Sequence, residues 1–177
     1  MKKNVIKSAF YCAGFVLADQ IIKLIIAAFY MDSEIVLIKG TLFFIPVQNT
    51  SLTWLTSKFN VYINRILLFF ILVLVTVIAV IIFMYVIYLI GKYQKLCYFL
   101  LSVFTAGLIC LLIDVLFWGG SIDYIKIFDW FIFDLKDIYT KTALPVIILY
   151  FIEYVKLTKE ERRQKGFADW IRKNIYK

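Results

Sequence analysis

Residues 66–90 form a run of twenty-five residues without a single charged side chain. An α-helix needs about 20 apolar residues to cross the hydrocarbon core of a bilayer, so this run predicts a transmembrane helix. Three further runs predict the same, at residues 9–30, 96–118 and 138–155. Because 63% of the chain is hydrophobic and its mean hydropathy is +0.88, we expect an all-α membrane protein with four transmembrane helices, in which residues 1–177 form a single integral membrane domain.

The distribution of basic residues predicts the orientation. The segment before the first span holds three, the loop 91–95 holds two and the tail 156–177 holds eight, whereas the other two loops and the start of the last span hold six. Since loops rich in Lys and Arg stay in the cytoplasm, both termini should be cytoplasmic and the loops 31–65 and 119–137 should face outward. The net charge of +8 then reflects topology and a basic tail on anionic membrane lipid, so we expect no nucleic-acid partner.

The first outer loop should contain a small extracytoplasmic β-rich structure. Residues 34–47 hold two β-rich runs that are separated at Gly40, a pattern typical of a small sheet on the membrane surface. Further along the loop, Trp54, Leu55 and Phe59 predict a short interfacial helix before the second span.

The residue inventory excludes several kinds of chemistry. The chain has no histidine, which rules out Ser-His-Asp and Cys-His catalysis and any histidine-ligated metal. Cys12, Cys97 and Cys110 are odd in number and all lie in apolar runs, so we expect small buried side chains and neither a disulfide framework nor a zinc site. We expect no metal and no cofactor, and any enzyme here must work with carboxylates, lysine, serine or water.

Asp19, Lys23 and Asp114 lie well inside predicted spans, where an ionisable residue costs roughly 2.5 to 3.5 kcal/mol at the helix centre, whereas Lys141 and Glu153 lie near the ends of the fourth span. Asp19 and Lys23 stand four residues apart on one helical face and can neutralise each other. A structural ion pair and a role in a functional site are both open for them. Asp114 has no opposite charge within reach in its own helix, so it needs a partner from another helix, for which Lys23 is the candidate, or water.

The predicted topology brings three carboxylates to the outer interface. Asp114 lies near the outer end of the third span, Asp137 at the start of the fourth and Asp123 in the loop between them. Two carboxylates in a partly desolvated place share a proton, so one can deprotonate a water while the other donates a proton to a peptide group. The alternative is that these are ordinary solvated loop carboxylates. The same loop also holds Asp129, Asp134, Lys126 and Lys136.

Five segments, taken in chain order, resemble the motifs of bacterial lipoprotein signal peptidase, also called signal peptidase II, a four-span aspartic peptidase of the inner membrane. They are Asp19-Gln-Ile-Ile-Lys23, Val47-Gln-Asn-Thr-Ser51, Leu111-Leu-Ile-Asp114-Val115, Ser121-Ile-Asp123-Tyr124 and Phe133-Asp-Leu-Lys-Asp137. The resemblance implies that Asp123 and Asp137 are the catalytic dyad. The supporting or substrate-binding residues that it implies are Asp19, Lys23, Asn49, Asp114 and Asp134.

The resemblance also implies the substrate and the location. The substrates would be diacylglyceryl-modified prolipoproteins, cut just before the modified cysteine at the outer leaflet without a metal. The protein would be a multi-pass protein of the bacterial cytoplasmic (inner) membrane, with both termini cytoplasmic and with membrane lipid around it. Neither the particular lipoproteins nor an oligomeric state follows from the sequence.

The chain departs from the family pattern around the expected dyad. Leu111 stands where the family has Asn, Val115 where it has Arg, Asp134 where it has a second Asn, Lys136 where it has Ala, and Ser51 where Gly is usual. These departures support a second reading, a divergent non-catalytic paralogue that binds lipopeptide or a partner protein without cleaving it. A third idea, a small transporter or channel subunit, has no broken-helix or repeat pattern behind it.

Overall fold

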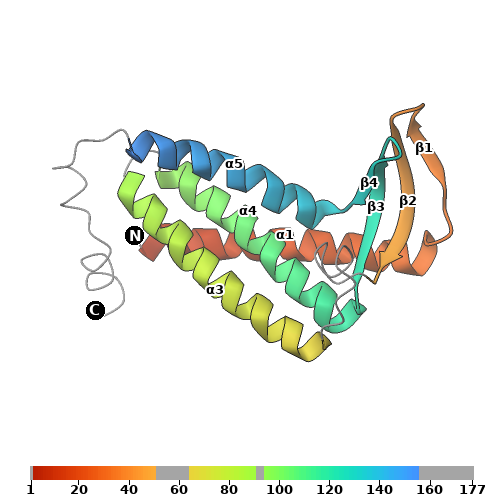
Figure 1. The fold of residues 1–177 in the computed structure, drawn as a ribbon, viewed down its shortest axis with the longest axis horizontal. Helices are drawn as coiled ribbons and strands as arrows, with labels where there is room; N and C mark the ends of the chain where they lie inside the picture. The colour runs from red at the N-terminus through yellow and green to blue at the C-terminus, as the bar shows by residue number, and fades with distance from the viewer. Residues whose placement is uncertain (1, 51–63, 91–93, 156–177) are drawn as a thin grey trace.

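The protein is described from a computed structural model, which covers residues 2–50, 64–90 and 94–155. Within these ranges, long helices run side by side and a small sheet lies at one end of them (Figure 1). The helices are α1 (Lys2–Phe29), α3 (Arg65–Ile90), α4 (Gln94–Ile113) and α5 (Leu135–Val155). A five-residue π-helical segment, η1 (Asp114–Trp118), continues α4.

Three of these helices are long and apolar enough to cross a membrane, over Asn4–Phe29, Arg65–Leu89 and Lys95–Trp118. They coincide with the first three predicted spans. The fourth predicted span, 138–155, falls within α5, and its crossing of the membrane stays a prediction. Large apolar side chains cover the outer surface of α3, as expected of a helix that faces lipid. Examples are Ile66, Leu67, Phe70 and Leu74, each more than half exposed.

α4 lies at the centre of the bundle and packs against α1, α3 and α5. Gly107 lets α5 approach closely, because a Cβ atom at this position would lie 2.6 Å from Thr140 Cγ2 and 3.0 Å from the Lys136 carbonyl oxygen. The three cysteines are buried between the helices, as the sequence predicts. This packing fixes the start of α5, and with it Lys136, relative to α4.

The sheet is antiparallel, with the strand order β1 (Ile35–Ile38), β2 (Leu42–Asn49), β3 (Ser121–Ile127) and β4 (Phe131–Phe133). The predicted β structure of the first outer loop is confirmed, with Gly40 in the β1–β2 turn at φ +74°. The description as all-α with β structure only in this loop was too narrow, because β3 and β4 come from the second outer loop. The signal was present in β3, where Ile122 and Tyr124 alternate with Ser121 and Asp123.

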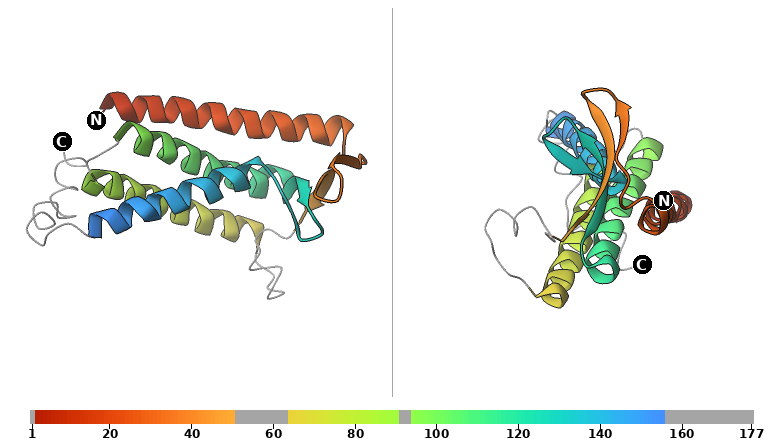
Figure 2. Two further views of the ribbon diagram at one scale, coloured as in Figure 1. Left: turned by 90° about the horizontal axis from the view of Figure 1, so that it is seen from above. Right: turned by 90° about the vertical axis from the view of Figure 1, so that its right-hand side faces the viewer.

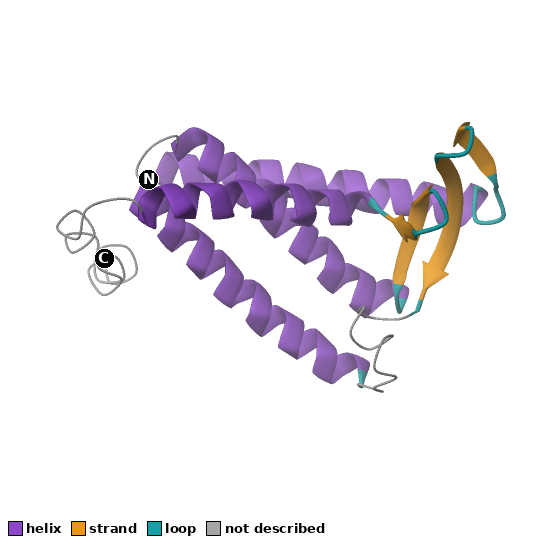
Figure 3. Ribbon diagram, turned by 45° about the horizontal axis from the view of Figure 1, so that its top comes forward, coloured by secondary structure: helices purple, strands orange, loops and turns teal. Residues whose placement is uncertain are grey.

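The sheet lies at the end of the bundle where α1 and η1 finish and α5 begins (Figures 2 and 3). The first residues of α1 and the last of α5 lie at the opposite end (Figure 1). β2 pairs with β3 so that Val47 faces Asp123 and Asn49 faces Ser121. The strands therefore hold the polar residues of both predicted outer loops against the ends of the helices. The predicted interfacial helix near Trp54 and the basic tail 156–177 are outside the described residues.

Candidate active site

The polar residues singled out in the sequence gather where the sheet meets the helices. Asp19 and Lys23 come from α1, Asp114 from η1 and Asp123 from β3. All four are buried, with side chains no more than 8% exposed. Asn49 ends β2, Asp134 and Lys136 lie at the β4–α5 junction, and Asp137 lies in the first turn of α5.

Lys23 is the centre of the buried charges. Its Nζ atom lies 2.7 Å from Asp114 Oδ2, 2.7 Å from Asp134 Oδ2 and 3.1 Å from Asp19 Oδ2. The side chain is fully buried, so one ammonium group balances carboxylates from three parts of the chain. The expectation that Asp114 takes its counter-charge from Lys23 is confirmed.

Lys136 is a second buried cation. Its Nζ atom donates hydrogen bonds to Asp134 Oδ2 and Ser121 Oγ, and lies 3.1 Å from Asp114 and 3.6 Å from Asp123. The alternative of solvated loop carboxylates does not hold for Asp134, because Asp134 and Lys136 are both buried against the helix ends. That reading does describe the neighbouring pair of Lys126 and Asp129, whose carboxylate is 93% exposed.

Asp123 is held by hydrogen bonds to both of its oxygen atoms. The side-chain amide of Asn49 donates to Oδ2 at 3.0 Å, and the hydroxyl of Ser121 lies 2.7 Å from Oδ1. Asn49 and Ser121 are partners in the β2–β3 ladder, so the sheet itself carries the groups that orient this carboxylate. Gly120 keeps the strands close, because a Cβ atom there would overlap the carbonyl of Asn49.

Asp137 occupies a different environment from Asp123. Its backbone N–H donates to Asp134 Oδ1 at 3.1 Å, so Asp134 is the N-cap of α5 and fixes its first turn. The Asp137 carboxylate is 31% exposed and lies 3.6 Å from Lys141 Nζ. Of the two aspartates expected to form the dyad, Asp123 is therefore enclosed while Asp137 reaches the surface of the cluster.

Burial raises the pKa of the Asp137 carboxyl above its ordinary value, and the negative charges of Asp134 and Asp123 add to this, while Lys136 and Lys141 oppose it. Asp134 behaves in the opposite way. Although burial alone would raise its pKa, the adjacent ammonium groups of Lys136 and Lys23 lower it overall. The same contact raises the pKa of Lys136 against the effect of its own burial. Asp134 and Lys136 are thus a charged pair at neutral pH, and the Asp137 carboxyl keeps its proton to higher pH than an ordinary aspartate does.

The π-helical turn of η1 gives Asp114 its position. Gly119 closes this turn in the left-handed region at φ +67°, and its N–H donates to the Asp114 carbonyl oxygen. Trp118 then donates from Nε1 to the side chain of Gln20 at 3.0 Å, and Gln20 donates to Asp19 at 3.0 Å. The Asp-Gln pair on α1 therefore ties the end of α4 to the buried charges.

Sequence reasoning missed the participation of Ser121 and Lys136 as site residues. Ser121 was quoted only as part of a motif, yet its hydroxyl contacts Asp123, Asp134 and Lys136. A Ser-Lys pair can act as nucleophile and base, but Lys136 is held charged by its carboxylates, which leaves it unable to take the proton of Ser121. Among residues 2–50, 64–90 and 94–155, no group of three or more Cys, Asp or Glu is arranged to hold a metal ion.

The protein has long apolar helices with a cluster of buried aspartates and lysines at one end. These features place it in the class of multi-pass membrane proteins with a carboxylate-rich site. Within that class, the chain belongs to the signal peptidase II family, because the family model described as Signal peptidase (SPase) II matches residues 11–153. Membership supports a signal peptidase II-type protease that acts on lipoprotein precursors in a bacterial membrane.

Two solved structures, both titled as bacterial membrane enzymes determined by the in meso method, share the fold. One, at 1.9 Å resolution, is 21% identical with a TM-score of 0.60, covering 86% of this chain and 94% of that chain. The other, at 2.3 Å resolution, is 22% identical with a TM-score of 0.61, covering 87% and 92%. No curated protein matches the chain.

Proposed function

We propose that this protein is an aspartic endopeptidase that removes signal peptides from diacylglyceryl-modified prolipoproteins, with Asp123 and Asp137 as its catalytic pair. The observation that carries the proposal is the contrast between the two aspartates. Asp123 is enclosed and accepts hydrogen bonds from Asn49 and Ser121, whereas Asp137 is partly exposed and has a raised pKa. Such a division between two neighbouring carboxyl groups separates the base from the acid.

In the proposed reaction Asp123 takes a proton from a water molecule, and the oxygen of that water attacks the carbonyl carbon of the scissile peptide. Asp137 enters protonated and donates its proton as the carbon–nitrogen bond breaks, so that the new amine leaves neutral. The proton that Asp123 received returns to Asp137 or to solvent and restores the starting state. The histidine-free inventory is sufficient for each of these steps.

Several residues that depart from the family pattern contact one another or take over a lost charge. This favours a catalytic site over one that has lost its function. Val115 replaces an Arg of the family, but Lys136 brings a positive charge to Asp114 at 3.1 Å. Lys136 stands at a family Ala and Asp134 at a family Asn, and these two substitutions form an ion pair with each other. We infer that the chain has exchanged one set of polar groups around the dyad for another.

The depth of the site suits a lipid-modified substrate. α5 is proposed as the fourth span, with Asp137 at its outer start and both chain termini in the cytoplasm. The cluster then lies at the outer interface of the inner membrane, where a diacylglyceryl group anchors a cysteine to the outer leaflet. An apolar pocket of about 410 Å³ between α1 and the sheet, lined by residues such as Ile26, Phe44 and Tyr124, adds apolar surface at this level.

The deciding experiment is cleavage of a diacylglyceryl-modified prolipoprotein by the purified protein in detergent, followed by gel mobility. Wild type should release the signal peptide, and globomycin, an inhibitor associated with the family, should block the release. Asp123→Asn and Asp137→Asn should each abolish cleavage, because an amide neither activates water nor donates the required proton. Asp129→Asn, at a carboxylate that is 93% exposed, is the matched control and should retain full activity.

The alternative is a non-catalytic paralogue that binds lipopeptide or a partner protein. It rests on the replacement of the family Asn and Arg by Leu111 and Val115. Binding of the modified prolipoprotein by wild-type protein without any cleavage would establish this alternative. Full turnover by either dyad variant would instead mean that other residues carry the reaction.

A further inference from the structure

A cavity lined by two lysines lies at the end of the bundle away from the sheet. It has a volume of about 340 Å³ and lies between the first turns of α1 and α4. Lys7 and Asn4 line it from α1, Lys95 lines it from α4, and Tyr11 and Phe99 close its apolar side. None of these residues belongs to the site described above.

The two lysines are a concentrated positive charge. Residues 1–18 and 64–113 contain no Asp or Glu, so neither helix offers a carboxylate close to the cavity. The ion pairs seen among the described residues involve Lys23, Lys126, Lys136 and Lys141, and none involves Lys7 or Lys95. Both side chains are exposed, and the cavity therefore presents two lysine cations to whatever occupies it.

The helix directions add to this charge. α1 begins at Lys2 and α4 at Gln94, and the two helices pack along each other. Their N-terminal ends, which carry partial positive charge, therefore both point toward the surface at which the cavity opens. Neither helix has an acidic residue in its first turn. Each helix thus offers one ammonium group and one N-terminus, and together they favour an anion that contacts both helices.

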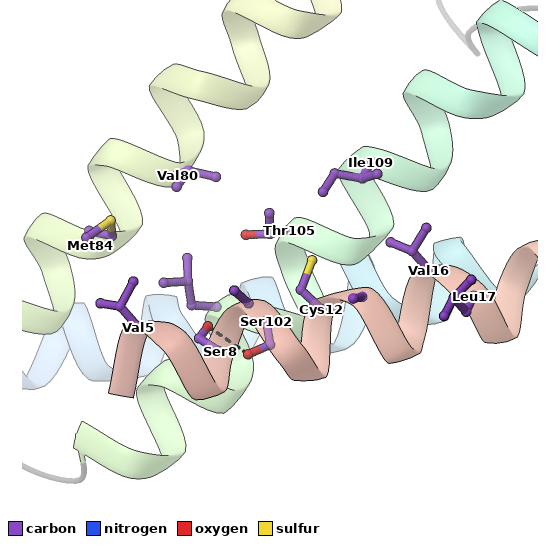
Figure 4. Close-up of a pocket in the computed structure, with 13 residues that line it drawn as sticks. Val5, Ser8, Cys12, Val16, Leu17, Val80, Met84, Ser102, Thr105 and Ile109 are labelled. Carbon is purple, nitrogen blue, oxygen red and sulfur yellow. Dashed lines mark hydrogen bonds between the residues drawn. The ribbon is translucent and has the colours of Figure 1, made fainter. Parts of the chain in front are cut away.

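Ser8 and Tyr98 line the cavity on the side that faces the bundle and take part in a hydrogen-bonded contact with Ser102. Ser8 lies 2.8 Å from the hydroxyl of Ser102 and donates to the Tyr98 carbonyl at 3.0 Å. On the other side of the Ser8–Ser102 contact lies an apolar groove of about 640 Å³ between α1, α3 and α4, and both serines line it (Figure 4). An anion in the cavity would therefore stay at the level of the membrane surface and not enter the bundle.

Aromatic side chains continue from the cavity toward the middle of the bundle. Tyr11 and Phe99 meet edge to face at 6.0 Å, Phe99 meets Phe15 at 5.9 Å, and Phe15 meets Tyr139 at 5.2 Å. A ligand with an anionic end at the lysines and an apolar body along these rings matches both parts of the surface. A phospholipid has this form, and basic pockets between membrane helices are suited to anionic head groups.

We propose that the cavity formed by Lys7, Lys95 and Asn4 binds the phosphate of an anionic phospholipid, with an acyl chain of that lipid along Tyr11, Phe99 and Phe15. The lipid joins α1 to α4 at the end of the bundle opposite the candidate active site. The bound lipid fixes α1, which carries Lys23, relative to α4, which continues into η1 with Asp114. This site stands independently of the proposed peptidase activity.

The test measures lipid retention and the thermal midpoint of the full chain in neutral detergent supplied with phosphatidylglycerol, phosphatidylcholine or inorganic phosphate. Wild type should retain phosphatidylglycerol and gain thermal stability from it, and should do neither with the other two. Lys7→Gln combined with Lys95→Gln should weaken retention roughly 30-fold, since each lysine at a membrane surface contributes a factor of about five. Lys7→Arg with Lys95→Arg should retain the lipid.

Lys39→Gln combined with Lys126→Gln removes the same charge from the sheet end and is the matched control, which should bind as wild type does. Equal retention of phosphatidylglycerol by the Lys7 and Lys95 double variant would overturn the proposal. Equal retention of phosphatidylcholine would also overturn it, since the cavity would then not select a net anionic lipid. A midpoint shift with inorganic phosphate as large as that with phosphatidylglycerol would show an anion site without a lipid.

Discussion

Lys23 on α1 and Asp114 on η1 stand 91 residues apart in the chain, yet their side chains form a buried salt bridge with a closest approach of 2.7 Å. The same ammonium reaches Asp134 from the opposite end of the second outer loop. One lysine thus fixes the first helix, the end of the third predicted span and the start of α5 relative to one another. The position of the candidate dyad depends on this contact, because Asp123 lies between Asp114 and Asp134 in the chain and Asp137 follows Asp134 by three residues.

The first prediction concerns this lysine. Lys23→Met should lower the thermal midpoint in detergent markedly, because it leaves Asp19, Asp114 and Asp134 without their shared counter-charge in a buried place. Removal of one partner of a buried ion pair costs about 3 to 5 kcal/mol. Lys126→Met, which removes an exposed pair with Asp129, should cost about 0 to 1 kcal/mol. Similar midpoints for the two variants would contradict the buried network.

The second prediction concerns the two family departures that pair with each other. Asp134→Asn and Lys136→Ala, each of which restores the family residue, should be destabilising alone. The double variant should be less destabilised than the sum of the two, with a coupling energy of about 0.5 to 3 kcal/mol. Asn preserves the cap of α5, since Asn and Asp serve equally at this position, so the cycle isolates the charge pair.

Chemical denaturation of the four proteins in detergent measures this coupling. The equivalent cycle at the exposed pair of Lys126 and Asp129 is the control and should give a coupling near zero. A buried-pair coupling no larger than that of the control would show that Asp134 and Lys136 changed independently of each other.

Much of the arrangement of the site could be predicted from the sequence, because charged residues are rare within apolar spans and are therefore easy to identify. Asp19, Lys23 and Asp114 stood out as costly residues within apolar runs, and topology alone placed Asp114, Asp123 and Asp137 at one level. Lys23 was the candidate partner of Asp114 because its helix can reach the same outer level and Asp19 lies one turn away from it. These inferences rest on long helices and on solvation, which a single sequence expresses clearly.

The contribution of the second outer loop could not be predicted in the same way. Its charges, including Lys126 and Lys136, look alike in the sequence, but β3 alternates its side chains between two faces and α5 begins at Leu135, directly after its N-cap Asp134. Lys136 is therefore turned into the cluster while Lys126 pairs with Asp129 at the tip. Such a distinction depends on strand register and on a helix cap, which are tertiary outcomes and not properties of composition.

The third prediction tests how Asp123 is oriented. Asn49→Ala should reduce kcat of the proposed peptidase by about 10-fold or more with a smaller change in KM, because a hydrogen bond to a charged group contributes about 1.5 to 3 kcal/mol. Gln48→Ala, on the neighbouring residue whose amide donates to the Trp118 carbonyl, is the control and should leave kcat within about twofold. A loss confined to KM would show that Asn49 binds substrate and does not position Asp123.

The fourth prediction is the orientation in the membrane. Asp129→Cys, at the exposed tip between β3 and β4, should react with an impermeant thiol reagent added to intact cells, whereas Lys95→Cys should react only after the membrane is opened. The native cysteines are buried, so the background should be low. The reverse labelling pattern would invert the topology and place the carboxylate cluster at the cytoplasmic face.

The last prediction uses the raised pKa of Asp137. Burial and the charges of Asp134 and Asp123 raise this pKa, whereas Lys136 and Lys141 lower it. If protonated Asp137 is the acid, activity is lost as the pH rises through its pKa. Lys141→Met removes an opposing charge 3.6 Å away, so the pKa of Asp137 should rise further and the alkaline limb of the kcat/KM profile should move to higher pH.

Lys126→Met serves as the control for this profile, because its ammonium pairs with Asp129 and is not among the charges that act on Asp137. The acid limb should stay in place in both variants. Since Lys141 is 64% exposed, solvent screens its charge and the displacement should be small, and it should shrink further at high salt. A shift of the acid limb to higher pH in Lys141→Met, with the alkaline limb unchanged, would mean that the ionised form of Asp137 is the one required, and the roles of the two aspartates would be exchanged.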